Sequence, residues 1–174
     1  MVVCSIDKEQ PIILSSSPGA NIPCERAHIR DNTLAYWSED ASGVTIHVCN
    51  LETLNTQTLL LPRDARVENA YSNGKITAWF ENYYSTSIFI YDHAKHALYS
   101  IEEYVFSIDL VDRTVLINTG DSIIAYDLDN NSRHVLIEPN SQQRYIMARV
   151  TSDNKFIAFS DMPDGSVETT IVER

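Results

Sequence analysis

The amino-acid sequence predicts an all-β fold built from short antiparallel strands that recur in about four similar units. Three observations predict this fold. Val, Ile, Thr and Tyr are frequent in the chain, and β-branched and aromatic residues favour strands. One pattern of apolar residues returns about every 40 residues along the sequence. Polar turns separate the apolar runs, and no apolar stripe with helical periodicity appears in them.

The repeated pattern is a short strand that follows a polar turn. An apolar residue fills the matched position in every unit: Leu34, Ile76, Val115 and Phe156. These positions are separated by 42, 39 and 41 residues. The preceding turns contain Asp, Asn or Gly, which accept left-handed backbone geometry or bond to their own main chain. They span residues 30–32, 72–74, 111–113 and 152–154.

Each unit also contains a candidate strand before the turn and one or two strands after the matched segment. Four short antiparallel strands in about 40 residues are the length and strand count of a β-propeller blade. We therefore predict one β-propeller-type domain, or a fragment of one, over residues 1–174. Its units cover approximately residues 24–61, 67–101, 105–137 and 145–174, with residues 1–14 as a partial blade. A β-sandwich with a chance regularity is the alternative architecture.

The ends of the chain bear on how such an array closes. The first residues resemble the third and fourth strands of a blade, and the last residues resemble a third strand. Three blades are thus predicted to be complete and two partial. The terminal strands could combine to close a ring, or the array could stay open and expose strand edges that pair with another chain. A homo-oligomer of half-rings and a longer parent protein are both consistent with an open array.

Two short motifs resemble a known repeat family. Residues 151–160, Thr-Ser-Asp-Asn-Lys-Phe-Ile-Ala-Phe-Ser, resemble the core of TolB-like, WD40-like (PD40-type) propeller repeats, and residues 161–166 resemble the glycine-containing turn that follows it. Residues 72–78 are a weaker second match. The third repeat lacks the Asp-Gly type of turn, and the proline of the family motif is absent throughout. The resemblance implies blade geometry and says nothing about a substrate.

Composition limits the partners of the chain. The formal net charge is −11, which repels nucleic-acid phosphates and anionic membranes, so we expect neither as a partner. The three cysteines, Cys4, Cys24 and Cys49, have no metal-site spacing and are odd in number. We interpret them as reduced thiols in a reducing compartment. No basic and apolar leader begins the sequence, so we expect a cytoplasmic location.

One histidine motif could suggest a metal site. Asp92, His93 and His96 form an Asp-His-x-x-His sequence, which on a helix could bring two imidazoles to one metal ion. The motif lies between two predicted strands, so we predict a solvated turn. We expect no cofactor in this chain.

A second group of acidic residues could suggest a calcium loop. Asp161, Asp164 and Glu168 lie close in sequence, but the alternating oxygen ligands and the terminal bidentate Glu of a calcium loop are missing. A hairpin turn of the Asp-Gly type accounts for the same residues.

Aromatic residues supply the candidate binding site. Large aromatic side chains carry much of the burial in a core, and we predict packing between blades for five of them: Tyr36, Trp37, Trp79, Phe80 and Phe159. Tyr83 and Tyr84 fall in a predicted loop, and tyrosines are enriched at interfaces. We therefore predict that Tyr83 and Tyr84 contact a partner.

No catalytic motif is recognisable, and the function we favour is a non-enzymatic scaffold that binds a protein partner through its loops. An acidic surface would prefer basic protein segments or cations. The alternative is the propeller portion of a hydrolase, either a peptidase gating domain or a lactonase-like enzyme. Glu25, Glu68 and Asp109 stand at matched strand starts and could serve the lactonase-like alternative as metal ligands. A truncated propeller fragment is the third interpretation.

Overall fold

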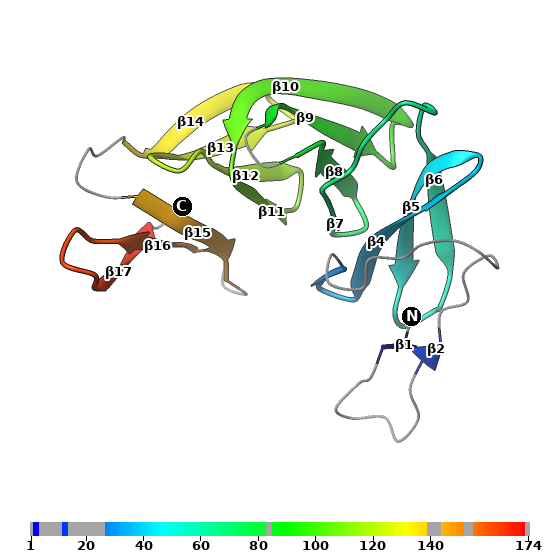
Figure 1. The fold of residues 1–174 in the computed structure, drawn as a ribbon, viewed down its shortest axis with the longest axis horizontal. Coiled ribbons are helices and arrows are strands. Elements are labelled where there is room, and N and C mark those ends of the chain that lie inside the picture. The colour runs from blue at the N-terminus through cyan, green and yellow to red at the C-terminus, as the bar shows by residue number, and fades with distance from the viewer. Residues whose placement is uncertain are drawn as a thin grey trace.

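Among the residues described by the computed structural model, all regular structure is β-strand (Figure 1). The described residues are 2–3, 12–13, 27–82, 85–138, 144–151 and 155–172, and for the first two pairs the description covers the backbone. Within these ranges there is no apolar helix of membrane-spanning length. The predicted all-β fold is confirmed.

Three sheets have four strands each, and in each sheet consecutive strands pair antiparallel. The first complete blade contains β3 (His28–Arg30), β4 (Thr33–Asp40), β5 (Gly43–Asn50) and β6 (Thr56–Leu60). The second contains β7 (Asn69–Ser72), β8 (Ile76–Phe80), β9 (Ser85–Asp92) and β10 (Ala97–Val105). The third contains β11 (Ser107–Val111), β12 (Thr114–Asn118), β13 (Ile123–Asp127) and β14 (Ser132–Ile137).

Two further sheets are partial blades. The C-terminal sheet has three strands in the order β15 (Arg144–Val150), β16 (Phe156–Asp161) and β17 (Val167–Val172). β17 therefore ends the sheet, and its far edge pairs with no other described strand. The N-terminal sheet consists of β1 (Val2–Val3) and β2 (Ile12–Ile13). Three complete and two partial blades are the arrangement that the repeats predict.

The same turn follows the third strand of every complete blade. Asn50, Asp92 and Asp127 end these strands, and the side-chain Oδ1 of each accepts hydrogen bonds from the main-chain N–H groups two and three residues further on. The fourth residue after each of them has a positive φ, and these residues are Leu54, His96 and Asn131. This local bonding explains why an acidic or amide residue ends the strand in each unit.

The turn between the first and second strands also repeats, with one difference. Asp31, Gly74 and Asp112 have positive φ angles of 50°, 82° and 53° in the three complete blades. Arg30 pairs directly with Thr33, whereas Ser72 pairs with Thr77, so the turn in the second blade is two residues longer.

The longer turn corrects the match made from sequence. Leu34 and Val115 each follow the residue that pairs with the turn-forming Asn50 or Asp127. In the second blade Asp92 pairs with Ile76, so Thr77 takes the matched place and Ile76 precedes it by one. A shift of one residue in a strand moves a side chain to the opposite face of the sheet. Ile76 therefore packs toward the third blade, in the cluster that includes Ile108 and Leu110.

Apolar side chains fill the space between neighbouring blades. Phe80, Ile88 and Ile90 of the second blade pack with Ile108 and Leu110 of the third, and all are buried. A second cluster joins the third blade to the C-terminal sheet, and a third joins the first and second blades. A single blade is too thin to bury both of its faces, so each needs its neighbour.

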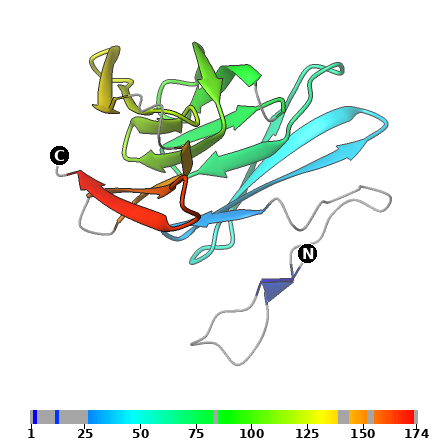
Figure 2. The ribbon, with the colours of Figure 1, turned by 60° about the vertical axis from the view of Figure 1, so that its left-hand side comes forward.

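The sheets follow one another along an arc, with the first complete blade and the C-terminal sheet at its two ends (Figures 1 and 2). The first strands lie on the inner, concave side. β3 and β4 contact β7, β7 contacts β11, and β11 contacts β15. The fourth strands, β6, β10 and β14, lie on the outer side (Figure 1).

Candidate functional site

An apolar groove lies between the first and second complete blades, and we call it the Trp79 groove. Its volume is about 480 Å³, within the size range of ligand-binding clefts. The first blade contributes β6 and the loop after it, and the second contributes side chains of β8, β9 and β10. The apolar lining consists of Leu59, Leu60, Leu61, Pro62, Ala65, Trp79, Phe89, Tyr91 and Leu98.

The aromatic wall of the groove arises from strand alternation. Trp79 on β8 and Phe89 on β9 are directly paired, so their side chains stand on the same face of the sheet. Their ring centroids are 5.7 Å apart with an interplanar angle of 22°. Phe80, the next residue on β8, is buried on the opposite face. One face of β8 thus packs against the third blade, and its other face lines the groove.

The loop after β6 forms the opposite wall and is held on the first blade. The N–H of Leu61 donates to the carbonyl of Val44 at 3.0 Å, and the N–H of Ala65 donates to the carbonyl of Pro62 at 2.9 Å. Gly43 has a φ of 129°, and a Cβ at this position would lie 3.5 Å from Cα of Arg63. The loop therefore packs closely on the β4–β5 hairpin, and its shape is fixed by the main chain.

One exposed apolar side chain lies beside the groove. Leu98 pairs with Tyr91 and so shares its face of the sheet, and Leu98 is 61% exposed while Trp79 is 5% exposed. Leu60 is 68% exposed, but Leu59 and Leu61 on either side of it pack between the first two blades, so strand alternation places the Leu60 side chain on the other face. An exposed aliphatic group beside a buried aromatic floor suits a ligand that inserts an apolar group.

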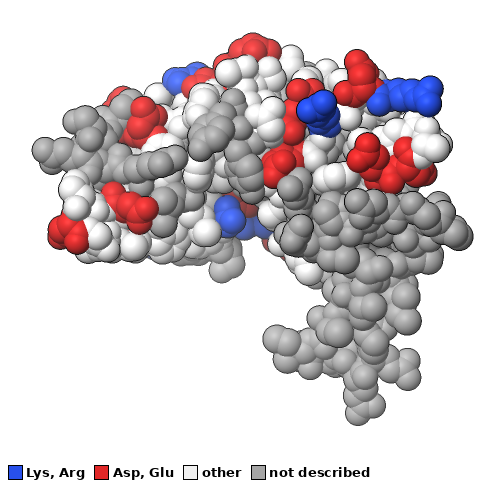
Figure 3. Space-filling view, in the orientation of Figure 1, with Lys and Arg blue, Asp and Glu red and all other residues white. Residues whose placement is uncertain are grey.

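The charged residues of the groove are mainly acidic. Asp64, Glu81 and Arg66 line it, and all three are exposed. The whole chain carries 24 acidic against 13 basic residues, and Figure 3 shows acidic side chains spread over the face in view. A ligand with positive charge would therefore meet a complementary field.

Solved structures share the architecture of this chain. A streptogramin B lyase superposes with a TM-score of 0.50 at 14% identity, over 81% of this chain and 51% of the lyase chain. The WD40 repeats of RRP9 give 0.51 at 13% identity, over 82% and 43%. A chain of a mitotic checkpoint complex gives 0.54 at 13% identity, over 97% and 57%. The fold is that of a β-propeller.

The likeness concerns the propeller fold alone, because identities of 12–15% carry no function with them. The chain spans about half the length of the propellers named above. No protein-family model matches the sequence, and the search of curated proteins finds no match. The finer TolB-like resemblance remains a prediction.

The next blade interface of the propeller has a smaller, more polar counterpart of the groove. Its volume is about 320 Å³, and it lies between β10 of the second blade and β13 of the third. Tyr99 and Tyr126 face it, and Tyr126 donates a short hydrogen bond to Oδ1 of Asn131. Its aromatic rings carry hydroxyl groups where the Trp79 groove has an indole and a phenyl ring. The Trp79 groove is thus the more apolar of the two.

The predicted aromatic residues divide into two groups. Trp79, Phe80 and Tyr36 are buried, and Trp79 and Phe80 belong to clusters between blades, as predicted. Trp37 is half-buried against the cluster of the first two blades, and Phe159 is half-buried outside the described clusters.

Tyr83 and Tyr84, the predicted partner contacts, lie outside the described residues. Glu81, two positions before Tyr83, lines the Trp79 groove. The role of the two tyrosines therefore stays a prediction.

The Asp-His-x-x-His motif forms part of the propeller's own turns. The carboxylate of Asp92 accepts a hydrogen bond from Arg113 of the third blade at 2.6 Å. This bond is the main cause that holds the pKa of Asp92 at about 2, below its usual value of 3.8. Nε2 of His93 lies 2.7 Å from Thr77 Oγ1, and Nδ1 of His96 lies 3.1 Å from the Tyr91 hydroxyl. Burial lowers the pKa of His93 from 6.5, which favours the neutral ring. The predicted turn is present, but Asp92 is buried and His93 half-buried, so this part of the turn is not solvated as predicted.

The second acidic group also forms a turn. Asp164 Oδ1 accepts hydrogen bonds from the Ser166 N–H at 2.9 Å and the Ser166 hydroxyl at 2.6 Å. Gly165 adopts a φ of 81°, and the turn joins β16 to β17. The hairpin expected for residues 161–168 is therefore present.

The acids considered for a lactonase-like site do not form a metal centre in the described residues. Glu25 lies outside them. Asp109 is buried on β11, where its carboxylate accepts a hydrogen bond from the Val150 N–H at 2.9 Å and pairs with Arg30 at 3.4 Å. Among the residues that the structure describes, no three His, Cys, Asp or Glu side chains gather in a metal-binding group. Cys49 is a free, buried thiol, and Cys4 and Cys24 are outside the described part.

Sequence reasoning did not find the Trp79 groove. Leu60 and Leu98 belong to outer strands that the repeat pattern describes only as short apolar segments. Their exposure depends on which face of each outer strand turns toward the neighbouring blade. The run Leu59-Leu60-Leu61-Pro62 could have indicated an apolar surface here, because a solvent-exposed edge strand is usually more polar than this run.

Proposed function

We propose that this propeller array is a non-enzymatic binding module that holds a basic protein segment in the Trp79 groove. In this proposal an apolar side chain of the partner inserts beside Leu98 onto Trp79. The observation that carries the proposal is the combination of a 480 Å³ apolar cleft with a leucine that is 61% exposed beside it. An isolated exposed leucine is ordinary on a protein surface, but one beside an apolar cleft with an aromatic floor extends a contiguous apolar site.

Charge selects the kind of partner. The formal net charge of −11 and the acidic pair Asp64 and Glu81 attract lysine and arginine side chains that flank an apolar anchor. Arg66 at the same groove leaves one position for an acidic or carbonyl group of the partner. A partner with one apolar anchor between basic residues therefore fits the described surface.

Trp79 supplies a built-in reporter for the test. The chain has two tryptophans, and the Trp37→Phe variant leaves Trp79 as the only one. The probe is a short acetylated and amidated peptide with one Leu flanked by lysines. Two control peptides carry Gly in place of the Leu, or Glu in place of the lysines. We expect saturable changes in Trp79 fluorescence with the first peptide and much weaker binding of both controls.

A pair of matched variants separates the groove from the rest of the surface. Leu98→Asp places a charge at the mouth of the groove, and Ile171→Asp does the same on β17, where the side chain is 59% exposed. Burying one leucine side chain is worth about 1.5–3 kcal/mol, so L98D is expected to weaken binding by about tenfold or more. I171D is expected to bind as the parent protein does. Equal effects of L98D and I171D, or equal binding of the Leu and Gly peptides, would overturn the proposal.

A further inference from the structure

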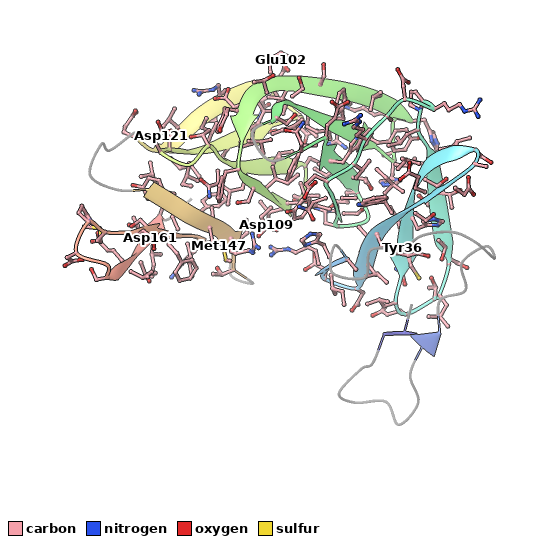
Figure 4. The ribbon with its side chains drawn as sticks, viewed as in Figure 1. Tyr36, Glu102, Asp109, Asp121, Met147 and Asp161 are labelled. Carbon is pink, nitrogen blue, oxygen red and sulfur yellow. The ribbon has the colours of Figure 1, made fainter. Side chains whose placement is uncertain are left out.

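A small polar pocket lies on the concave side of the array, and we call it the channel pocket. Its volume is about 90 Å³, and the four first strands β3, β7, β11 and β15 all contribute to its wall. Ser72 and five ring-bearing or charged residues make up its polar lining, and the five that decide its chemistry are His28, Arg30, Tyr71, Asp109 and Arg149. Figure 4 shows Asp109 on this inner side, close to the β15 strand that bears Met147.

The charges of the pocket do not balance. Two guanidinium groups, Arg30 and Arg149, face it together with one carboxylate, Asp109. Oδ2 of Asp109 accepts hydrogen bonds from the Val150 N–H at 2.9 Å and from Arg30 at 3.4 Å. Oδ1 of Asp109 accepts a hydrogen bond from the Leu110 N–H at 2.9 Å. Arg149 donates to the carbonyl of Ala148 at 3.0 Å and forms no ion pair with a described residue. One excess positive charge thus remains in a chain whose net charge is −11.

A second observation points to a missing acceptor. Nη1 of Arg30 donates to the Val150 carbonyl at 2.9 Å, so the guanidinium is fixed across the channel. Nε of the same group is buried and has no hydrogen-bond partner among the described residues. Buried donors are nearly always satisfied in folded proteins, by protein, water or ligand. The fixed guanidinium therefore keeps a donor without a described acceptor beside the pocket that Arg30 lines.

The rest of the pocket wall is rigid. The His28 ring stacks on Tyr71 with centroids 4.0 Å apart, and His28 Nε2 lies 3.3 Å from Oδ1 of Asn69. An amide Oδ1 only accepts hydrogen bonds, so Nε2 carries the proton. Burial is the largest cause that lowers the pKa of His28 below 6.5, and the charge of Arg149 also lowers it, while the hydrogen bond to Asn69 and the charge of Asp109 act in the opposite direction. His28 is therefore a neutral ring that senses the charge beside it.

We propose that the channel pocket binds a carboxylate group, held by Arg149 and Arg30. A singly charged oxyanion matches the one excess positive charge, and two parallel N–H groups of an arginine fit the two oxygens of a carboxylate. The pocket has the volume of about three water molecules, which admits a carboxylate and little more. The carboxylate can come from a small acid or from the C-terminus of a peptide. This proposal is independent of the Trp79 groove, which lies on other strands.

The test follows the His28 ring by NMR while a carboxylate is added. The probes are acetate, inorganic phosphate at equal ionic strength, and one short neutral peptide with either a free or an amidated C-terminus. We expect acetate to shift the His28 signals saturably and to raise the pKa of His28, because a bound anion offsets the charge of Arg149. A stronger effect of the free-acid peptide than of acetate would identify a peptide terminus as the source, and equal effects would identify a free acid.

Variants of Arg149 give the decisive comparison. Arg149→Gln removes the unpaired charge and is expected to weaken acetate binding at least tenfold. Arg149→Lys keeps the charge without the planar guanidinium, and we expect its affinity for acetate to lie between those of Arg149→Gln and the parent protein. This variant provides the comparison if Arg149→Gln does not fold. Arg133→Gln is the control, because Arg133 pairs with Glu103 on the outer strands at 2.9 Å. Unchanged acetate binding in Arg149→Gln, no response to any carboxylate, or a stronger response to phosphate than to acetate would overturn the proposal.

Discussion

Replacing Asp92 by Asn removes one charge from the junction between the second and third blades and leaves the turn beside it intact. The Asp92 side chain is 0% exposed, and its Oδ2 accepts the 2.6 Å hydrogen bond from Arg113. Its Oδ1 accepts hydrogen bonds from the Ala94 and Lys95 N–H groups, and an Asn side chain has the same oxygen to offer. The first blade already uses Asn50 in this role. The substitution therefore isolates the ion pair.

The magnitude follows from the pKa of the carboxyl group. The Arg113 hydrogen bond is the largest cause that holds the pKa of Asp92 at about 2, against a usual value of 3.8. One pKa unit corresponds to about 1.4 kcal/mol, so the folded state gains roughly 2 kcal/mol from the ionised form. We expect D92N to lower the free energy of unfolding by about that amount at neutral pH. For a domain of this size about 2 kcal/mol corresponds to a fall of about 4–8 °C in Tm.

The pH dependence has a definite sign. Because the folded pKa is depressed, the stabilisation is fully present above the unfolded pKa near 4 and is lost as pH falls through about 2. The difference between the parent and D92N should therefore shrink as the pH falls from about 5 toward 2. Urea unfolding followed by tryptophan fluorescence over this range measures it.

A double-mutant cycle with Arg113→Gln assigns the effect to the pair. We expect the two substitutions together to cost clearly less than the sum of the single costs, because either one breaks the same bond. Asn50→Asp is the matched control: it adds a charge at the equivalent turn, and we expect a change below about 0.5 kcal/mol. Additive costs of D92N and R113Q, or equal stability of the parent and D92N from neutral to acidic pH, would refute the reasoning.

Three further substitutions test other features of the fold by the same unfolding measurement. Leu54→Gly relieves a leucine held at a φ of 60° and should stabilise the protein by about 1 kcal/mol, and a loss of stability would contradict the repeated turn. Phe80→Ala empties the centre of the packing between the second and third blades and should cost about 3–5 kcal/mol, so a cost below about 1 would contradict that packing. Ser160→Ala removes a buried hydroxyl that has no partner in the described part of the chain, and it should be neutral or stabilising by about 1 kcal/mol, whereas a marked loss would reveal a bond.

The sequence was sufficient to predict the blades because the determinants of their turns are local. Asn50, Asp92 and Asp127 cap their own turns through bonds to the next few residues, so the pattern is visible without knowledge of the fold. The same locality explains the one-residue error at Ile76. The longer turn after Ser72 shifts the register of the second blade, so Thr77 is the structural equivalent of Leu34. By residue type, however, the apolar Ile76 matches Leu34 better than Thr77 does.

The two sites could not be predicted in the same way because each is assembled from separate blades. Leu61 and Leu98 are 37 positions apart in sequence, and both line the Trp79 groove. Arg30 and Arg149 come from the two ends of the array and meet in the channel pocket only because the blades follow an arc. Which residues face one another across such an arc depends on the angle between neighbouring sheets, and no spacing in the sequence gives that angle.

Native-state hydrogen exchange, resolved by residue, tests the blade architecture most directly. The second strands β4, β8, β12 and β16 pair on both sides, while β6, β10, β14 and β17 end their sheets. We predict that the slowest amides recur in four groups near residues 34–38, 76–80, 114–118 and 156–160, with faster exchange in the sheet-ending strands. Slow exchange in one continuous block, or equal protection of the outer and second strands, would contradict the account of this chain as a series of propeller blades.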